Sequence, residues 1–217
     1  MNDADTRFQA ARLVLQLRQA GVTDHNVAEA LEMTPRDQFT PRPFEANAWE
    51  NVELPIDCGQ SMTRPVTVGV MVQALGAEKG HTVLEIGCGT GYVAAVLSRL
   101  ARRVYSMDRY RTLLEKARAL IERLDMAARI ELRHGDGIAG WPEAAPFDRI
   151  LIMGAVPEIP LELSRQLAPG GIAVMPAERA GRVVIVRMMK RPDGSFAEAV
   201  IAPASFASLE PGIAREL

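Results

Sequence analysis

The sequence predicts an α/β protein built on a doubly wound, mostly parallel sheet, with an N-terminal helical extension and antiparallel strands at the C-terminal edge. Between residues 82 and 175, apolar runs of strand length alternate with stretches of helical periodicity, which is the pattern of a parallel sheet flanked by helices. A glycine-rich turn joins the first strand of this series to its helix, as in Rossmann-like folds. Two further strand-like runs, 182–190 and 195–201, surround the turn from Pro192 to Ser195 and predict a terminal hairpin.

Length and composition are those of one ordinary domain. The chain has 217 residues, of which 48% are hydrophobic and 24% charged, and its net charge is −2. Without a basic excess we expect no nucleic-acid partner. No apolar run approaches a membrane span and the N-terminus lacks a signal-peptide layout, so we expect a cytoplasmic protein with no membrane partner. The two cysteines, Cys58 and Cys88, have no CxxC pair or histidine cluster beside them, so neither a metal site nor a disulfide is expected.

A helical cap is predicted for residues 1–55. Apolar residues recur at helical spacing between residues 7 and 20, and a second helix is expected after the N-cap pair Thr23 and Asp24. Residues 39–55 are rich in proline and aromatic side chains, so we expect an irregular segment anchored to the body by its aromatic rings.

The rest of the chain is organised around residues 82–108, which predict a strand, a turn, a helix and a second strand. The turn carries glycine at Gly87, Gly89 and Gly91. Glycine tolerates positive φ, and its missing Cβ lets a ligand lie against the backbone. Asp108 ends the second strand, where an acid binds the ribose hydroxyls in nucleotide-binding units of this plan.

The acid before the turn separates this motif from the dinucleotide fingerprint. Glu85 stands two residues before Gly87, and the glycines occupy every second position instead of the GxGxxG spacing. This spelling resembles motif I of the class I S-adenosylmethionine-dependent methyltransferases. An acid suits a cofactor with a cationic amino group and sulfonium, and a pyrophosphate binder would avoid it. S-adenosyl-L-methionine is therefore the expected cofactor, and a nicotinamide dehydrogenase is disfavoured.

The remaining elements continue the alternation. We expect a helix at 113–124, strands at 129–133 and 149–153, a helix at 160–167, a turn at 169–171 and a strand at 172–175.

A polar loop precedes the helix that leads into the first strand. It runs from Gly59 to Pro65, and Pro65 suits the first turn of the helix. The hydroxyls of Ser61 and Thr63 are ordinary N-cap groups, so a cap explains them as well as a role in a site does.

Several stretches outside the glycine turn are distinctive sequence motifs. They are Ala48-Trp49-Glu50-Asn51, the loop from Gly59 to Pro65, His134-Gly-Asp-Gly137 and Gln166-Leu-Ala-Pro-Gly-Gly171. Together they resemble the protein-L-isoaspartate (D-aspartate) O-methyltransferase family, over roughly residues 7 to 178. We expect a single methyltransferase domain in three parts: the helical cap (1–55), a cofactor-binding core (56–178), and a C-terminal hairpin with a substrate-side segment (179–217).

The resemblance implies methyl transfer from S-adenosyl-L-methionine to the carboxylate of L-isoaspartyl residues in damaged proteins or peptides, which is protein repair. It implies a monomer or weak dimer. The family's catalytic serine falls on Thr63, and Ser61 shares its loop, so both are expected to act on the acceptor. The cofactor-binding residues that the resemblance implies are Gln60, Ser61, Met62, Thr63, Glu85, Gly87, Gly89, Gly91, Asp108, Arg109, Asp136 and Gly137.

This chain departs from the family on the substrate side. The loop has Ser61-Met62-Thr63 where the family has Thr-Ile-Ser, and residues 205–209 differ from the family's Arg-Phe-Val-Pro-Leu. Two alternatives therefore stay open: a methyltransferase of the same fold with another carboxylate or small-molecule acceptor, and a non-catalytic protein that binds S-adenosylmethionine.

Overall fold

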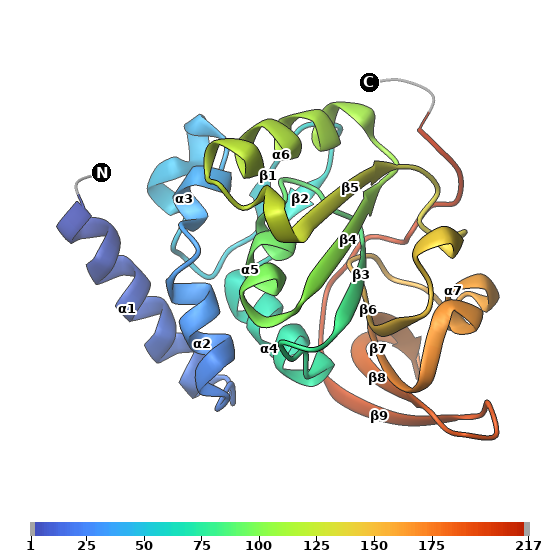
Figure 1. The fold of residues 1–217 in the computed structure, drawn as a ribbon. Helices are drawn as coiled ribbons and strands as arrows, with labels where there is room; N and C mark the ends of the chain where they lie inside the picture. The colour runs from blue at the N-terminus through green and yellow to red at the C-terminus, as the bar shows by residue number, and fades with distance from the viewer. Residues whose placement is uncertain (1–2, 215–217) are drawn as a thin grey trace.

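The computed structural model describes residues 3–214, and their side chains from residue 8 onward. The described part of the chain begins with a group of helices that pack on the helices covering one side of a large sheet (Figure 1). The second helix begins as expected, because the Asp24 carboxylate accepts hydrogen bonds from the backbone of Asn26 and Val27. These elements are α1 (Asp3–Gln19), α2 (His25–Glu32), α3 (Arg36–Phe39) and the 3₁₀ helix η1 (Arg42–Asn47).

A small hairpin, which the sequence did not predict, connects these helices to the sheet. Strand β1 (Leu54–Pro55) pairs antiparallel with β2 (Ser61–Met62). We call residues 57–64 the front loop. Helix α4 (Pro65–Leu75) follows it directly and ends at Gly76, whose φ is 60°.

One sheet of seven strands forms the centre of the described chain, in the order β5-β4-β3-β6-β7-β8-β9. The pairs from β5 to β7 are parallel, and β8 and β9 add antiparallel strands at one edge. This confirms the predicted doubly wound, mostly parallel sheet. The strands are β3 (Thr82–Ile86), β4 (Arg103–Asp108), β5 (Ile130–His134), β6 (Phe147–Ile152), β7 (Leu167–Arg179), β8 (Arg182–Lys190) and β9 (Phe196–Pro203).

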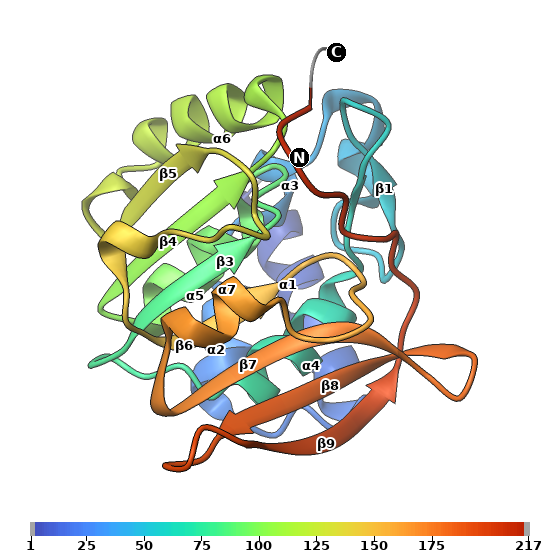
Figure 2. The same cartoon turned by 90° about the vertical axis from the view of Figure 1, so that its right-hand side faces the viewer.

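Each face of the sheet has its own apolar core, because successive side chains of a strand point to opposite faces. Val83 belongs to the core under the N-terminal helices, whereas its neighbour Leu84 belongs to the other core. Figure 2 shows α7 lying across the second face. The remaining helices are α5 (Tyr92–Leu100), α6 (Arg111–Arg123), η2 (Ala127–Arg129), η3 (Pro142–Ala144) and α7 (Leu161–Gln166).

The fifth parallel strand is longer than expected. It begins at Leu167, which pairs with Phe147, and the pairing then shifts so that Ile172 is the next partner on β7. The turn predicted at residues 169–171 falls at this shift of register, inside β7, and Gly170 adopts a φ of 75° there.

The described residues contain no helix that is both long and apolar enough to cross a membrane. The three-part division of the domain stays a prediction. Its first boundary, after residue 55, falls between the paired strands β1 and β2.

Candidate active site

A cavity of about 380 Å³ lies at the carboxyl ends of β3, β4 and β6. From β3 the chain continues toward one edge of the sheet, and from the neighbouring β6 it continues toward the other. Open α/β sheets bind their ligands at such a switch point, and the volume is within the range of small-molecule sites. Four segments contribute most of the lining: 60–63, 86–90, 107–110 and 207–210.

The three glycines of the turn after β3 serve three different purposes. A Cβ on Gly87 would come 3.2 Å from the Cβ of Met153, so Gly87 allows close approach to the end of β6. A Cβ on Gly91 would come within 3.1 Å of side chains on α6. At Gly89, with a φ of 54°, the nearest atom to an added Cβ is Ile56 Cδ1 at 3.6 Å. Only Gly87 and Gly89 line the cavity, where the bare backbone is open to a ligand.

Asp108 lines the cavity and its carboxylate is held in a fixed orientation. One oxygen accepts a hydrogen bond from Gly89 N at 2.7 Å, and the other accepts from Tyr110 N at 2.9 Å. Burial raises the pKa of Asp108, and these backbone donors act against that rise. A carboxylate has about four acceptor sites, more than these backbone donors occupy, so Asp108 can also accept from a diol.

Glu85 lies beneath the turn and does not line the cavity. Its side chain is fully buried, and Ser106 Oγ donates to one carboxylate oxygen at 2.5 Å. The other oxygen has no hydrogen-bond partner among the described residues, and burial raises the pKa of Glu85 to about 8. The assigned contact of Glu85 with the cofactor therefore has no support in the cavity lining, and it stays a prediction.

The front loop is fastened to the cofactor side of the cavity. Gln60 Nε2 donates to the Tyr110 hydroxyl at 3.4 Å and to the Cys58 carbonyl at 3.1 Å. Lys116, on α6, forms an ion pair with Asp57 at 2.7 Å. The loop therefore covers one side of the cavity.

The hydroxyls of the front loop do not cap α4. The N-cap residue of that helix is Arg64, whose own side chain makes no cap hydrogen bond, and Pro65 occupies the first turn. The first-turn N–H of Val66 donates instead to Asn51 Oδ1 at 3.3 Å. Ser61 and Thr63 both line the cavity instead, together with Met62 and Gln60. The structure thus removes the simple explanation of these hydroxyls as helix caps.

With this geometry in place, comparison with known proteins is decisive. The family model described as "Protein-L-isoaspartate(D-aspartate) O-methyltransferase (PCMT)" matches residues 8–212. The chain belongs to this family. A protein-L-isoaspartate O-methyltransferase of Maricaulis maris is 48% identical over 206 residues, covering 95% of this chain and 96% of the relative. The corresponding protein of Rhodospirillum rubrum is 43% identical over 203 residues and covers 93% of both chains.

Solved structures agree with the family. A protein-L-isoaspartate O-methyltransferase superposes with a TM-score of 0.82 and 27% identity, covering 93% of this chain and 66% of that longer one. A second, described as a putative protein-L-isoaspartate O-methyltransferase from Plasmodium falciparum in complex with S-adenosyl-L-homocysteine, has a TM-score of 0.81. At 17% identity, with 92% of this chain and 97% of that chain covered, it supports the fold alone.

Three residues that the family resemblance assigned to the cofactor lie outside the cavity lining: Glu85, Gly91 and Asp136. Asp136 accepts a hydrogen bond from Ile138 N at 2.9 Å and so stabilises its own loop. Its neighbour Gly137 does line the cavity, and a Cβ there would overlap the Ile86 side chain. The other nine assigned residues line the cavity: Gln60, Ser61, Met62, Thr63, Gly87, Gly89, Asp108, Arg109 and Gly137.

The C-terminal segment of this family member closes another side of the cavity. Ala155 exchanges two backbone hydrogen bonds of 2.8 Å with Ala207 and Leu209. Figure 2 shows this segment leaving β9 and running past the carboxyl ends of the strands toward α6. Ala214 N then donates to the Arg109 carbonyl at 3.1 Å.

Sequence reasoning missed several lining residues. Met153 and Gly154 follow β6, and their place beside β3 depends on strand order, which no local pattern gives. Tyr92 and Glu210 were also missed. A signal existed at Gly154, where a Cβ would come 3.2 Å from Leu209 Cα, because a glycine directly after a strand indicates close approach of another chain segment.

Proposed function

We propose that this chain transfers a methyl group from S-adenosyl-L-methionine to the carboxylate of L-isoaspartyl residues in proteins and peptides, the first chemical step of their repair. The observation that carries the proposal is one cavity that joins an open glycine backbone and Asp108 to the hydroxyl-bearing front loop. Family membership supports the same activity.

The residues of the cofactor side fit S-adenosylmethionine. Gly87 and Gly89 leave room for a ligand against the backbone, and Asp108 has acceptor sites for ribose hydroxyls. Arg109 and Gly137 line the same side, toward which we assign the adenine. When bound, the cofactor supplies a methyl group that its sulfonium charge already activates.

The acceptor side needs no general base. An isoaspartyl carboxyl group has a pKa near 4, so it is ionised at pH 7 and ready to attack. The protein must align the carboxylate oxygen with the methyl carbon and keep water out. Thr63 is assigned to orient the acceptor by a hydrogen bond from its hydroxyl, with Ser61 in support; Gln60 and Met62 cover the methionine end of the cofactor.

Composition and family support a proposal for the partners and the location of the protein. We assign isoaspartyl proteins and peptides as the substrates, with no nucleic-acid or membrane partner. We assign the protein to the cytoplasm, as a monomer or weak dimer.

The test is labelled methyl transfer from S-adenosylmethionine to a peptide with one isoaspartyl residue, beside the same peptide with a normal aspartyl residue. Both peptides carry the same charge, so only the backbone connection differs. We expect turnover of the isoaspartyl peptide alone.

Three other outcomes are informative. Equal methylation of both peptides would indicate a broader carboxylate acceptor. Cofactor binding by calorimetry without turnover of either peptide would contradict the isoaspartyl assignment and favour another acceptor, or a binding role. Absence of cofactor binding would contradict the whole proposal.

A further inference from the structure

Arg36 is a charged side chain buried completely in the core. It is the first residue of α3, and its relative exposure is 0%. In the described part of the chain no ion pair links it to a carboxylate, and burial lowers its pKa. Burying a charged group without a counter-ion costs folding free energy, and hydrogen bonds from its donors offset only part of that cost. A buried arginine at this position therefore calls for an explanation.

The donors of Arg36 reach backbone carbonyls of two distant segments. Nε donates to the Ala48 carbonyl at 2.7 Å, and Nη2 donates to the Thr63 carbonyl at 2.9 Å. The planar guanidinium holds both at once, which the single ammonium of lysine does not reproduce. Arg36 therefore ties the helical cap to the front loop.

Thr63 needs such a tie because it lies between two regular elements. It follows the last residue of β2 and precedes Arg64, the N-cap of α4, so the regular hydrogen bonds of both elements end beside it. The hydrogen bond to its carbonyl holds the plane of the peptide between Thr63 and Arg64. This in turn restricts the direction of the Thr63 Cβ. Because threonine has a restricted χ1, a fixed backbone also restricts where its hydroxyl points.

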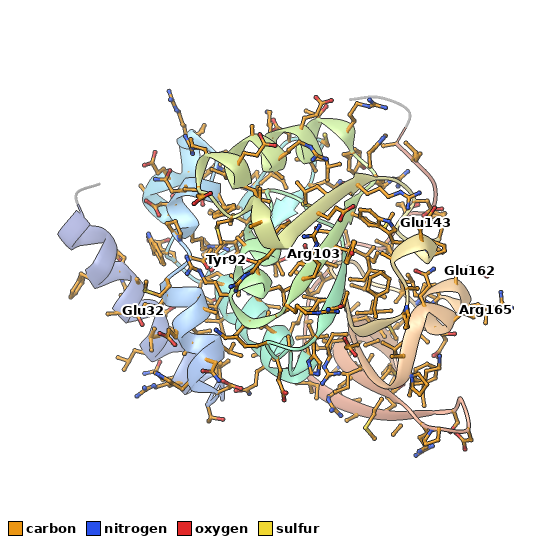
Figure 3. The ribbon with its side chains drawn as sticks, viewed as in Figure 1. Glu32, Tyr92, Arg103, Glu143, Glu162 and Arg165 are labelled. Carbon is orange, nitrogen blue, oxygen red and sulfur yellow. The ribbon has the colours of Figure 1, made fainter. Side chains whose placement is uncertain are left out.

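The same guanidinium contacts the cofactor side of the cavity. Its central carbon lies 4.8 Å from the centre of the Tyr92 ring. Tyr92 opens α5 directly after the glycine turn, lines the cavity, and lies between that helix and the N-terminal helices (Figure 3). One side chain thus contacts both the loop assigned to the acceptor and the first residue of the helix that follows the cofactor turn.

We propose that Arg36 is a positioning residue for methyl transfer, which holds the Thr63 main chain in register with the glycine turn. The inference rests on the proposed role of Thr63. It assigns to Arg36 no contact with substrate or cofactor, and its effect on the reaction passes through the Thr63 carbonyl.

Two substitutions of Arg36 separate positioning from stability. Arg36→Lys keeps the positive charge and loses the planar guanidinium that donates to both carbonyls. Arg36→Met keeps the length and removes the cost of burying a charge, so this variant is expected to fold even if the lysine variant does not. The matched control is Arg99→Lys, because Arg99 also donates to the helical cap, through Met33 O at 2.7 Å and Thr34 Oγ1 at 3.0 Å, away from the cavity.

The measurements are kcat and KM for the isoaspartyl peptide, the Kd of S-adenosylhomocysteine, the melting temperature, and hydrogen exchange of the front loop. Both Arg36 variants should lose at least about tenfold in kcat, since misplacement of a reacting group by about an ångström is that costly. Cofactor affinity should change less than about threefold, and exchange in residues 60–64 should quicken. The Arg99 variant should keep kcat within about twofold, whatever its loss of melting temperature.

Unchanged kcat in both folded Arg36 variants overturns the inference, as does an equal fall in the Arg99 control. If the unsubstituted protein itself does not methylate the isoaspartyl peptide, the proposed function fails separately. Hydrogen exchange then decides, because faster exchange confined to the front loop supports the positioning role and unchanged exchange overturns it.

Discussion

The two halves of the cavity are built in different ways. The cofactor half comes from one continuous stretch, 82–110, in which every residue of β3 is buried and backbone donors fix Asp108. The acceptor half is assembled from the front loop, the residues after β6 and the segment 207–210. Its strands β1 and β2 have two residues each. The cofactor half is therefore held together by contacts within one stretch of the chain. The acceptor half depends instead on contacts between distant segments, such as the hydrogen bonds of Arg36.

The largest expected effect of a substitution is in the cofactor half, at Gly89. Gly89→Val places a β-branched side chain at a φ of 54° and in space open to the ligand, so cofactor binding should be abolished. Calorimetry with S-adenosylhomocysteine measures it, and circular dichroism checks the fold. The control is Gly181→Val, which has a φ of 72° and no atom near its added Cβ. Normal binding by a folded Gly89→Val protein would show that the turn does not meet the ligand.

A smaller loss is expected at Asp108. Asp108→Ala should cost about 1.5–3 kcal/mol of cofactor affinity, the usual value of hydrogen bonds to a charged group. Asp136→Ala should cost less, because that acid lies outside the cavity lining and bonds its own loop. Titration calorimetry on both variants sharpens the comparison. Equal losses in the two variants would show that Asp136 contributes to cofactor binding as much as Asp108 does, although it lies outside the cavity lining.

The burial of the cofactor half predicts a pH dependence of stability. Burial raises the pKa of Glu85 to about 8, so the folded state keeps a proton that the unfolded state releases above about pH 4.5. Glu85 therefore destabilises the fold increasingly from about pH 4.5 to 8. Glu85→Gln should gain at least about 1.4 kcal/mol relative to the unsubstituted protein over that range, the value of one pKa unit. Denaturant unfolding at pH 5 and pH 8 measures it, and parallel stability curves would contradict the account.

The difference between the two halves of the cavity also explains which features could be predicted from the sequence. The sheet and the glycine turn depend on patterns between neighbours in the chain, so their bounds were predicted nearly correctly, except for the strand expected at 172–175, which is the longer β7 (Leu167–Arg179). Glu85 was assigned to the cofactor by motif, yet it pairs in register with Ser106 inside the sheet, where its carboxylate accepts a hydrogen bond from Ser106 Oγ.

The acceptor half was less predictable because its contacts join distant segments. The hairpin of β1 and β2 is too short to show a period of two. Contacts of Ala155 with Ala207 and Leu209, and of Arg36 with Thr63, depend on the folded sheet. The hydroxyls of the front loop were left between two explanations, and only the observed N-cap of α4 removed one.

The most direct test of a cavity with separable halves is a paired measurement on Thr63→Val. Valine keeps the shape of threonine and deletes its hydroxyl. We predict a loss of at least about tenfold in kcat/KM for the isoaspartyl peptide, or about 1.4 kcal/mol, with unchanged affinity for S-adenosylhomocysteine and an unchanged melting temperature. Thr63→Ser, the matched control, should retain most of the activity. A fully active Thr63→Val enzyme on the isoaspartyl peptide would contradict the assignment of the front loop to the acceptor.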